Sequence, residues 1–459
     1  MEQLQVDVLV IGWGKGGKTL AGALGRAGRS VAVVERSNRM YGGSCINIAC
    51  VPTKALVHRA EQRRFADDAQ AWFDAAVQER DDLTGRLRAR NHAMLKEVDA
   101  VTLIDGAARF VGPREVEVTA GGERLRVSAE TVVVNTGTEP ARPPVAGADG
   151  PHVYDSTSLQ HVSPFPRRLV VVGGGFVGLE FAGMFARFGS QVTVLNRGER
   201  LLPEEDADAA AAVEQSLVDA GVTFRHGTSA TAFVDARPTV VVQVDGPGEA
   251  TDLEADAVLC ATGRRPVTAD LDLSAAGVDT DERGYIVVDD HLRTSADGVY
   301  AVGDVNGGPQ FTFISLDDHR VVLSALTGDG SRTAKDRVAV PRTTFITPPF
   351  ARVGINATQA RDQGRSVLVA SKPVADIAAM PRPKIVEETH GLIGFVVDAE
   401  SDEVLGATLF CTDAQELVNL VALAMRAGVT ASRLRDGIWT HPSTTEALNE
   451  VLAGLRPLA

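Results

Sequence analysis

Cysteine is scarce in this chain, which has only four among its 459 residues. So few cysteines cannot form a disulfide framework, and a close pair is therefore expected to be catalytic or metal-binding rather than structural. Long apolar stretches are also missing, because no run reaches the roughly 18 residues that a membrane span needs. The N-terminus lacks the basic, apolar and small-residue order of a signal peptide. We expect a cytoplasmic protein without a membrane span.

An excess of basic residues is absent as well. The chain has 46 Lys and Arg against 60 Asp and Glu, which gives a formal net charge of −14. Nucleic acids and anionic membranes are bound through basic surfaces. Neither is expected as a partner.

Two segments share one order of strand, glycine-rich turn, helix and strand, at the length of a βαβ dinucleotide-binding unit. The first comprises Val6–Ile11, Gly12–Gly17, an Ala/Leu-rich helix and a strand that ends on Glu35. The second comprises Arg168–Val172, Gly173–Gly178, a helix from Leu179 to about Phe188 and the strand Gln191–Leu195. Their continuous apolar strands are typical of parallel sheets that are covered on both faces.

The rest of the chain is expected to form several further elements. Residues 55–98 predict long helices, residues 99–134 predict short antiparallel strands, and two apolar strands at 131–137 and 257–263 run into Thr-Gly turns. From about residue 341 the pattern becomes α+β, with strands near 366–374, 392–399 and 404–411 and helices from Ala414 and Ala431. A domain boundary is therefore expected between Val340 and Thr344.

The glycines of the two repeated units predict two nucleotide sites. Glycine lets the backbone approach a pyrophosphate, which is stabilised by the free N–H groups and the dipole of a helix N-terminus. The glycines concerned are Gly12, Gly14 and Gly17 in the first unit and Gly173, Gly175 and Gly178 in the second. Glu35 stands where a carboxylate accepts hydrogen bonds from a ribose diol. The alternative is that the glycines only permit tight packing.

The second unit carries Asn196 and Arg197 where the first has Glu35. A carboxylate would repel a ribose 2′-phosphate, whereas a guanidinium can pair with it. The second site should therefore prefer NADPH, with NADH possible. The alternative is that Arg197 is an ordinary surface arginine.

Cys45 and Cys50 lie five positions apart at the start of a predicted helix. They can reach disulfide geometry if the first helical turn is irregular, and a helix N-terminus lowers the pKa of a thiol. A metal site at this pair has no second Cys or His pair at ligand spacing to complete it. Cys260 and Cys411 stand in apolar segments and are expected to be buried and inert.

The segment around this pair, Gly42–Lys54, closely resembles the active-site signature of the FAD-dependent pyridine nucleotide-disulfide oxidoreductases, which include glutathione reductase, lipoamide dehydrogenase and mercuric reductase. Three further segments resemble markers of that family in the family's order: Ala261–Pro266, Val299–Asp304 and His441–Glu446. The resemblance covers nearly the whole chain. It implies an α/β enzyme with two Rossmann-like dinucleotide-binding domains plus a C-terminal α+β dimerisation domain.

The resemblance also implies domain limits and roles for single residues. The FAD-binding domain would comprise residues 1–150 and 266–340, the NAD(P)H-binding domain 151–265 and the dimerisation domain 341–459. Electrons would pass from the nicotinamide through FAD to a Cys45–Cys50 disulfide, with Cys50 toward the flavin and Cys45 toward the substrate. The implied acid–base group is His441 of the partner subunit in a homodimer. The other implied catalytic residues are Glu446, which orients that histidine, and Lys54 and Glu180 beside the flavin. The further implied cofactor contacts are Gly43, Ser44, Lys54, Thr136, Gly137, Gly263, Arg264, Gly303 and Asp304.

Three segments resemble a narrower branch, the bacterial reactive-chlorine-resistance flavoproteins, a group that includes hypothiocyanous acid reductases and has been linked to copper reduction: Gly12–Leu20, Phe311–Arg320 and Arg435–His441. The expected substrate is therefore a thiol-reactive oxidant such as hypothiocyanous acid. The alternatives are a mercuric or copper-type metal-ion reductase and a low-molecular-weight disulfide or lipoamide reductase. A redox sensor without turnover is a further alternative, which the complete set of catalytic residues opposes. Ala49 departs from the family, which usually has glycine before the second cysteine.

Overall fold

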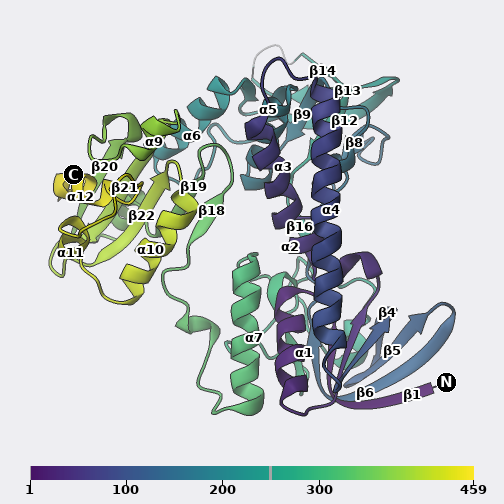
Figure 1. Cartoon of the computed structure of the whole chain (residues 1–459). Coiled ribbons are helices and arrows are strands. Elements are labelled where there is room, and N and C mark those ends of the chain that lie inside the picture. Colours follow the sequence, from purple (N-terminus) through teal and green to yellow (C-terminus); the bar gives the residue numbers. More distant parts are fainter. Residues whose placement is uncertain (1, 248–250, 459) are drawn as a thin grey trace. The chain divides into compact units, whose positions relative to one another are not determined.

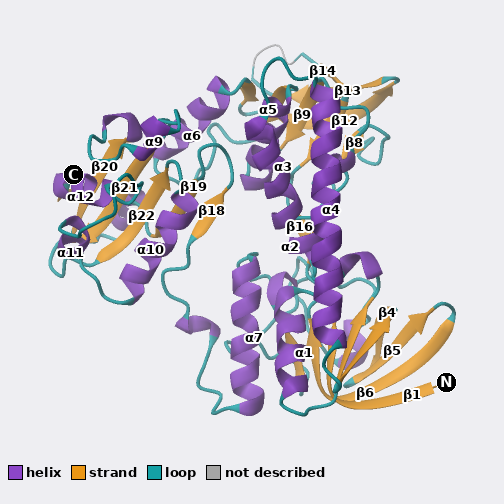
Figure 2. Ribbon diagram, in the orientation of Figure 1, coloured by secondary structure: helices purple, strands orange, loops and turns teal. Residues whose placement is uncertain are grey.

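A computed structural model describes residues 2–247 and 251–458, and its contacts divide the chain into two compact units. The first unit comprises residues up to Leu56, Asp74–Ala141 and Gly263–Arg337, and the second comprises Val57–Phe73, Arg142–Thr262 and Val338 onward. Figure 1 follows the chain through both, and Figure 2 marks its helices and strands. In the described part of the chain, no helix combines the length and apolar character needed to cross a membrane.

The first unit is built on a seven-stranded sheet with the order β3-β2-β1-β6-β5-β4, and β17 pairs with β6 as well. Its strands are β1 (Glu2–Ile11), β2 (Val31–Glu35), β3 (Val101–Asp105), β4 (Ala107–Gly112), β5 (Glu115–Ala120), β6 (Glu123–Val134) and β17 (Val299–Ala301). Strands β3, β2, β1, β6 and β17 run parallel, whereas β4 and β5 pair antiparallel. A small ribbon of β7 (Thr138–Pro140) and β16 (Arg264–Pro266) completes the strands of this unit.

Both faces of the parallel strands are buried, which confirms the interpretation of their continuous apolar sequence. In β1, Val8 and Val10 join the core that contains Leu20, while Leu9 and Ile11 join a separate core. The helices of the unit are α1 (Lys15–Arg26), α2 (Ser44–Asn47), α3 (Cys50–Gln62), α4 (Ala69–Lys96) and α7 (Thr312–Thr327), of which α3 and α4 also extend into the second unit. Helices α1 and α7 pack side by side.

The second unit contains a five-stranded parallel sheet with the order β11-β10-β9-β15-β8. These strands are β8 (Val153–Tyr154), β9 (Arg168–Val172), β10 (Gln191–Leu195), β11 (Val222–Arg225) and β15 (Ala257–Cys260). Its helices are α5 (Phe176–Phe188) and α6 (Ala207–Asp219), and a three-stranded antiparallel sheet is formed by β12 (Ser229–Ala236), β13 (Thr239–Asp245) and β14 (Leu253–Ala255).

The C-terminal part of the second unit is the expected α+β domain. Its six-stranded antiparallel sheet has the order β18-β19-β22-β21-β20-β23. The strands are β18 (Arg342–Thr344), β19 (Phe350–Gly354), β20 (Val367–Pro373), β21 (Leu392–Asp398), β22 (Val404–Phe410) and β23 (Arg456–Pro457). The helices are α8 (Ala357–Asp362), α9 (Arg382–Ile385), α10 (Ala414–Arg426), α11 (Ala431–Arg435) and α12 (Ala447–Val451).

Two local predictions differ from the structure. Residues 99–134 were expected to form short antiparallel strands. This holds for the pairing of β4, β5 and β6, but β3 pairs parallel with β2, and the long β6 also pairs parallel with β1. Helix α5 begins at Phe176, three residues before the predicted Leu179, because Gly175 serves as its N-cap. The expected α/β class with a C-terminal α+β domain is confirmed.

Candidate active site

The two cysteines of the first unit lie on either side of a break between two helices. Cys45 is in the one-turn helix α2, and Cys50 is the first residue of α3. Ile48 ends α2 with φ −139°, so the chain has the irregular turn that a bridge between these two cysteines requires. Both are free thiols here, Cys45 half-buried and Cys50 exposed. The two thiols are in contact, because a hydrogen bond joins them.

Thr312 brings the N-terminus of a longer helix to these thiols. It is the first residue of α7, and its Oγ1 lies 3.5 Å from the Sγ of Cys50. The hydroxyl also hydrogen-bonds Cys45 and lowers the pKa of that thiol. A helix N-terminus favours negative charge, so α7 stabilises a thiolate at this pair.

The balance at Cys45 nevertheless raises the pKa of its thiol. The largest cause is the hydrogen bond with Cys50, followed by burial, and both outweigh the opposing effects of Thr312 and Lys18. The sequence alone predicted a lowered value from the helix N-terminus. The structure differs because two thiols in contact do not both ionise readily, and the first proton is lost from the pair as a unit.

Lys18 is a charged residue near the thiols that the sequence patterns did not single out. Its side chain is only 8% exposed, and its ammonium donates to the carbonyl of Gly42 (3.4 Å) and to Oδ1 of Asn91. Burial lowers the pKa of Lys18 to about 8, and the ammonium charge acts on Cys45. Its only sequence signal was its place in the segment Gly12–Leu20, directly after the first glycine motif.

The glycine turn of the first unit lies directly against the end of β6. Gly12 has φ +96°, and a Cβ there would lie 2.5 Å from the carbonyl oxygen of Asn135. Helix α1 follows with Gly14 as its N-cap. The N–H groups of Gly16 and Gly17 in its first turn donate to Ser315 and Asn135, so the helix dipole, rather than these two donors, would favour an anion here. The backbone of Gly43 packs directly against this turn. A Cβ at Gly43 would lie 2.8 Å from Gly14 Cα, which explains the glycine at this position.

Other predicted flavin contacts of the first unit cluster around the strand ends. Glu35 is buried and accepts from the backbone N–H of Trp13 (3.1 Å). Burial raises the pKa of Glu35 against the effect of its hydrogen bonds from Ser37 and Trp13. Ser44 begins α2, and Thr136 donates its hydroxyl hydrogen to the carbonyl of Val267 (2.7 Å).

The segment Val299–Asp304, which resembles the second flavin motif of the family and has Asp304 as the expected contact of the ribityl chain, meets the same region through hydrogen bonds. The hydroxyl of Thr138 lies 3.1 Å from Asp304 and accepts from Nε of Arg264 (2.8 Å). Burial raises the pKa of Asp304, although Thr138 and Arg264 oppose this. A Cβ at Gly137 or at Gly263 would meet nothing within 4 Å. The backbone at these two glycines is therefore unobstructed, next to the hydrogen-bonded Thr138, Arg264 and Asp304.

Asn135 joins the two flavin motifs, and the sequence analysis missed it. Its Oδ1 accepts from the N–H of Gly17 (2.8 Å), and its Nδ2 donates to the carbonyl of Val302 (2.6 Å). Ser315 of α7 adds a parallel link by accepting from the N–H of Gly16 (3.0 Å). Asn135 is 118 residues from Gly17 and 167 residues from Val302, so only the fold reveals these bonds.

Asp318 holds the turn that carries Asp304. Its Oδ2 accepts from the N–H of Gly303 at 2.5 Å, and its Oδ1 pairs with Arg337. The side chain is 1% exposed, and burial raises the pKa of Asp318 against the effects of Gly303 and Arg337. Arg337 also pairs with Asp317 at 2.9 Å. The segment Phe311–Arg320 therefore supports the second flavin motif as well as the thiols.

The nucleotide motif of the second unit repeats the geometry of the first. Gly173 has φ +117°, and a Cβ there would lie 2.6 Å from the carbonyl oxygen of Ala261 at the end of β15. Gly175 caps α5 with nothing near its missing side chain, and a Cβ on Gly178 would lie 2.0 Å from the oxygen of Gly173. This unit can present the N-terminus of α5 to a pyrophosphate.

Asn196 follows β10 and faces this glycine turn. Its Nδ2 donates to the carbonyls of Gly198 (2.8 Å) and Arg200 (3.0 Å) and lies 3.1 Å from His226. Its Oδ1 is directed at the turn, because a Cβ on Gly174 would lie 2.7 Å from it. Asn196 therefore offers a neutral acceptor for a ribose hydroxyl, next to the exposed Arg197.

The remaining predicted catalytic residues also belong to the second unit, except Lys54. His441 Nδ1 lies 2.8 Å from Glu446, which accepts a second bond from the N–H of Ser443 (2.8 Å). Partial burial raises the pKa of Glu446, but the hydrogen bonds with His441 and Ser443 outweigh it and hold this pKa below its usual range. The side chain of His441 is 71% exposed, so the imidazole faces outward.

The expected pairing of Lys54 with Glu180 would join the two units and stays a prediction. Within its own unit, Lys54 Nζ donates to the hydroxyl of Thr53 (3.3 Å). Glu180 accepts from the N–H of Phe345 (2.8 Å). Cys260 and Cys411 are buried, as predicted, and burial raises the pKa of Cys260 to about 11.

Comparison with known families and proteins agrees with this geometry. Residues 6–317 match the pyridine nucleotide-disulphide oxidoreductase family, and residues 340–452 match the dimerisation domain of that family. The chain belongs to this family. It is therefore an FAD-dependent oxidoreductase that acts on NAD(P)H and a disulfide, and its dimerisation domain indicates a homodimer.

Individual members of the family are similar to this chain over nearly its whole length. The chain is 42% identical to the probable pyridine nucleotide-disulfide oxidoreductase RclA of Escherichia coli, over 97% of this chain and 98% of that protein. It is 35% identical to dihydrolipoyl dehydrogenase of Thermus scotoductus, over 99% and 98% of the two chains. The solved Cu(II) complex of the HOCl-induced flavoprotein disulfide reductase RclA from Escherichia coli matches with a TM-score of 0.92 and 41% identity, over 98% of this chain and 99% of that one.

The residues of this chain fit the cofactors that the family implies. Two kinds of feature in the first unit suit a dinucleotide. The N-terminus of α1, with Gly14 and Gly43 close together, suits a pyrophosphate, and the carboxylates of Glu35 and Asp304 suit its hydroxyls. The backbone at Gly137 is unobstructed, and the next residue, Thr138, donates a hydrogen bond to the carboxylate of Asp304. The second unit has the matching α5 site for NAD(P)H.

Proposed function

We propose that this enzyme uses NADPH to reduce a thiol-reactive oxidant, with hypothiocyanous acid as the principal substrate. The observation that carries the proposal is the Cys45/Cys50 dithiol, placed at the N-terminus of α7 and beside Thr312. That helix begins in the Phe311–Arg320 segment, by which the chain resembles the reactive-chlorine-resistance branch. The similar Escherichia coli protein is described as HOCl-induced, which is consistent with such a substrate.

The proposed reaction uses the two thiols in sequence. Cys45 attacks the sulfur of hypothiocyanous acid, hydroxide leaves as water after gaining a proton, and a sulfenyl thiocyanate forms on Cys45. Cys50 then attacks Cys45 Sγ, thiocyanate leaves, and the Cys45–Cys50 disulfide forms. Bound FAD supplies the electron pair that reopens the disulfide, taken as hydride from NADPH. Overall, hypothiocyanous acid and NADPH yield thiocyanate, NADP⁺ and water.

The acid–base residues of the proposal come from the C-terminal domain. His441 of the partner subunit takes the proton from Cys45 and delivers one to the leaving hydroxide, a task suited to an imidazole near neutral pH. Glu446 holds Nδ1 at 2.8 Å, which leaves Nε2 as the exposed nitrogen. This external base would offset the raised pKa of Cys45. Lys54 and Glu180 are proposed to act beside the flavin. The proposed domain limits are those expected from the sequence: 1–150 and 266–340 for FAD binding, 151–265 for NAD(P)H binding and 341–459 for dimerisation.

The choice of NADPH rests on the residues after β10. Asn196 presents a neutral oxygen to the nucleotide turn, where the first unit has the carboxylate of Glu35. Arg197 is exposed beside it and can pair with that phosphate, whereas Arg200 is engaged with the carbonyls of Pro203 and Glu205. NADH remains a usable donor at lower efficiency.

Reduction of a metal ion is the second candidate function. A dithiol is a soft-metal ligand, and the similar Escherichia coli protein has been solved as a Cu(II) complex. In the described part of this chain, no cluster of three or more His, Cys, Asp or Glu side chains is arranged to hold a metal ion. Within one chain the dithiol would therefore bind such an ion without a third ligand of those types.

The test is steady-state NADPH oxidation by the FAD-loaded enzyme with hypothiocyanous acid, glutathione disulfide, lipoamide, Cu(II) and Hg(II) in parallel. We expect hypothiocyanous acid to give the highest kcat/KM and to release thiocyanate in equal amount to the NADPH consumed. Cys260→Ser is the control, because that cysteine is buried in β15. Turnover with hypothiocyanous acid no faster than with glutathione disulfide would refute the substrate, and faster turnover with a metal ion would favour the second candidate.

A further inference from the structure

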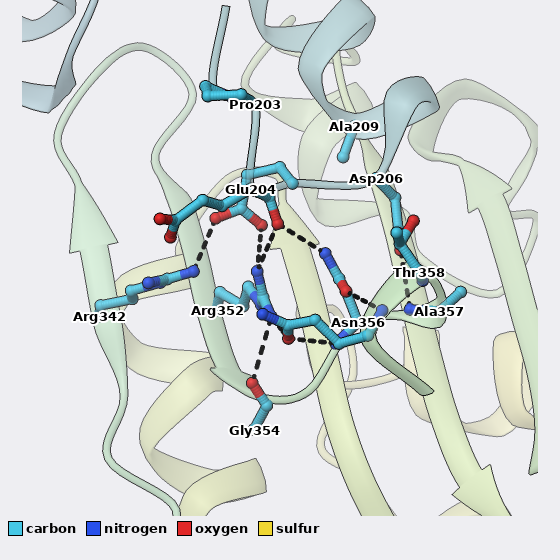
Figure 3. A network of polar contacts seen from close by, with 12 residues as sticks. Pro203, Glu204, Asp206, Ala209, Arg342, Arg352, Gly354, Asn356, Ala357 and Thr358 are labelled. Carbon is cyan, nitrogen blue, oxygen red and sulfur yellow. Dashed lines mark hydrogen bonds and ion pairs between the residues drawn. The ribbon is translucent and has the colours of Figure 1, made fainter. Parts of the chain in front are cut away.

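A network of buried charges joins the loop after β10 to the C-terminal domain. Glu205 and Arg352 are each 2% exposed, and they pair at 2.7 Å. Arg342 pairs with the other oxygen of Glu205 at 2.7 Å. Figure 3 shows Arg342 and Arg352 reaching from β18 and β19 to this loop. The glutamate thus comes from the nucleotide-binding domain and both arginines come from the C-terminal domain.

The residues on either side of Glu205 are held in the same way. The carbonyl of Glu204 accepts from Nδ2 of Asn356 (2.9 Å), which also caps α8. Asp206 accepts from the backbone N–H groups of Ala357 (3.0 Å) and Thr358 (2.9 Å). Figure 3 shows these contacts around the same turn. Three consecutive residues are therefore fixed to one surface.

A second series of hydrogen bonds leads from Glu205 back to the nucleotide turn. The guanidinium of Arg200 donates to the carbonyls of Glu205 (3.2 Å) and Pro203 (2.5 Å). The carbonyl of Arg200 accepts from Nδ2 of Asn196 (3.0 Å), whose Oδ1 faces Gly174. Arg197 lies within this closed series and is exposed. The backbone around Arg197 is thus connected to Glu205 through the hydrogen bonds of Asn196 and Arg200.

We propose that Glu205 and Arg352 are positioning residues for the electron donor: they hold the segment 196–206 so that Arg197 meets the 2′-phosphate of NADPH. This inference rests on the proposed use of NADPH. Without the buried pair this segment samples more conformations, and only the fraction with Arg197 in place binds the phosphate well. Asn196 keeps its own backbone bond to Arg225 (2.9 Å), so contacts shared by NADH and NADPH change less.

The test compares both donors in variants of the FAD-loaded enzyme. In Arg352→Met, KM for NADPH should rise about tenfold, the effect of one lost charge-assisted hydrogen bond, while kcat at saturating donor changes less than about twofold. KM for NADH should change by less than about threefold. Arg342 is only partly buried, so Arg342→Met should fold well and shift the same ratio in the same direction by a smaller factor. Glu205→Gln, which keeps an acceptor, should fall between the two.

The matched control is Arg168→Met. Arg168 is as exposed as Arg342 and pairs with two carboxylates, Glu254 and Asp256, but it stands at the start of β9, away from the glycine turn. Its variant should leave both KM values unchanged.

Two outcomes contradict the inference and are distinguishable. If wild-type enzyme uses NADH as well as NADPH, the assignment of NADPH fails, and the positioning role fails with it. If wild-type enzyme prefers NADPH but Arg352→Met and Arg342→Met shift both KM values in parallel or not at all, only the positioning role is overturned.

Discussion

Replacing Asp318 with alanine should weaken FAD binding far more than replacing its neighbour Asp317. Asp318 is 1% exposed and accepts from the N–H of Gly303 at 2.5 Å, directly before the ribityl-binding candidate Asp304. A hydrogen bond to a charged acceptor contributes about 1.5–3 kcal/mol. If that free energy holds the Gly303 turn in its binding conformation, its loss leaves roughly one molecule in ten to one in a hundred competent, and the Kd for FAD rises by the same factor.

The control variant separates this effect from a general loss of stability. Asp317 is 12% exposed and pairs with Arg337, Arg332 and Arg320, but it makes no hydrogen bond with the flavin turn. Asp318→Ala removes one of the two carboxylates that pair with Arg337, so its unfolding cost should lie near the lower end of the 3–5 kcal/mol known for broken buried pairs, at about 3 kcal/mol. Asp317→Ala should cost a similar amount yet change the Kd for FAD by less than about threefold.

The assay is titration of apoprotein with FAD, followed by quenching of flavin fluorescence, together with urea unfolding of the same samples. The reasoning predicts that the two variants differ in flavin affinity although their free energies of unfolding are alike. Equal weakening of FAD binding by Asp317→Ala and Asp318→Ala would refute it. So would wild-type affinity in a destabilised Asp318→Ala.

Three further predictions concern the thiols and their surroundings. Cys45→Ser should abolish reductase turnover but retain FAD and a long-wavelength thiolate–flavin absorbance, whereas Cys50→Ser should lose that absorbance; full activity in both variants would exclude the two-thiol mechanism. Glu446→Gln should lower kcat at least tenfold, because His441 loses its orienting carboxylate, and unchanged turnover in a pH series would contradict this role. Burial lowers the pKa of Lys18 to about 8 from its ordinary value of 10.5, so the unfolded chain binds more protons between these values. The free energy of unfolding of the wild type relative to Lys18→Met, measured with urea, should therefore rise as pH increases from about 8 to 10.5. A difference that does not change with pH would show that folding does not lower the pKa of Lys18.

Much of the fold could be predicted because the signals are local. The apolar strands before Gly12 and Gly173, the glycine turns themselves and the Cys45/Cys50 spacing are all properties of short segments. Helix α7 was not predicted, because Asp317 and Asp318 interrupt its apolar pattern, although both are buried. Their burial depends on Arg337, which the sequence does not mark as their partner.

The candidate site divides in the same way. Sequence patterns named the thiols, but only the structure shows that Cys45 has a raised pKa, since this depends on its contact with Cys50 and on burial. Asn135 was missed because a lone asparagine after a strand has no distinctive spacing, and its partner Gly17 is 118 residues away.

By itself the sequence determined which motifs this protein carries: two dinucleotide units, one thiol pair and a His441–Glu446 pair, because each is encoded by neighbouring residues in a fixed order. The tertiary structure alone decided which partners the buried charged side chains have. Lys18 meets Asn91, and Glu205 meets Arg352, across 73 and 147 residues. Such partners have no sequence signature, because the low-dielectric interior that makes a charge need a partner exists only once the chain has folded.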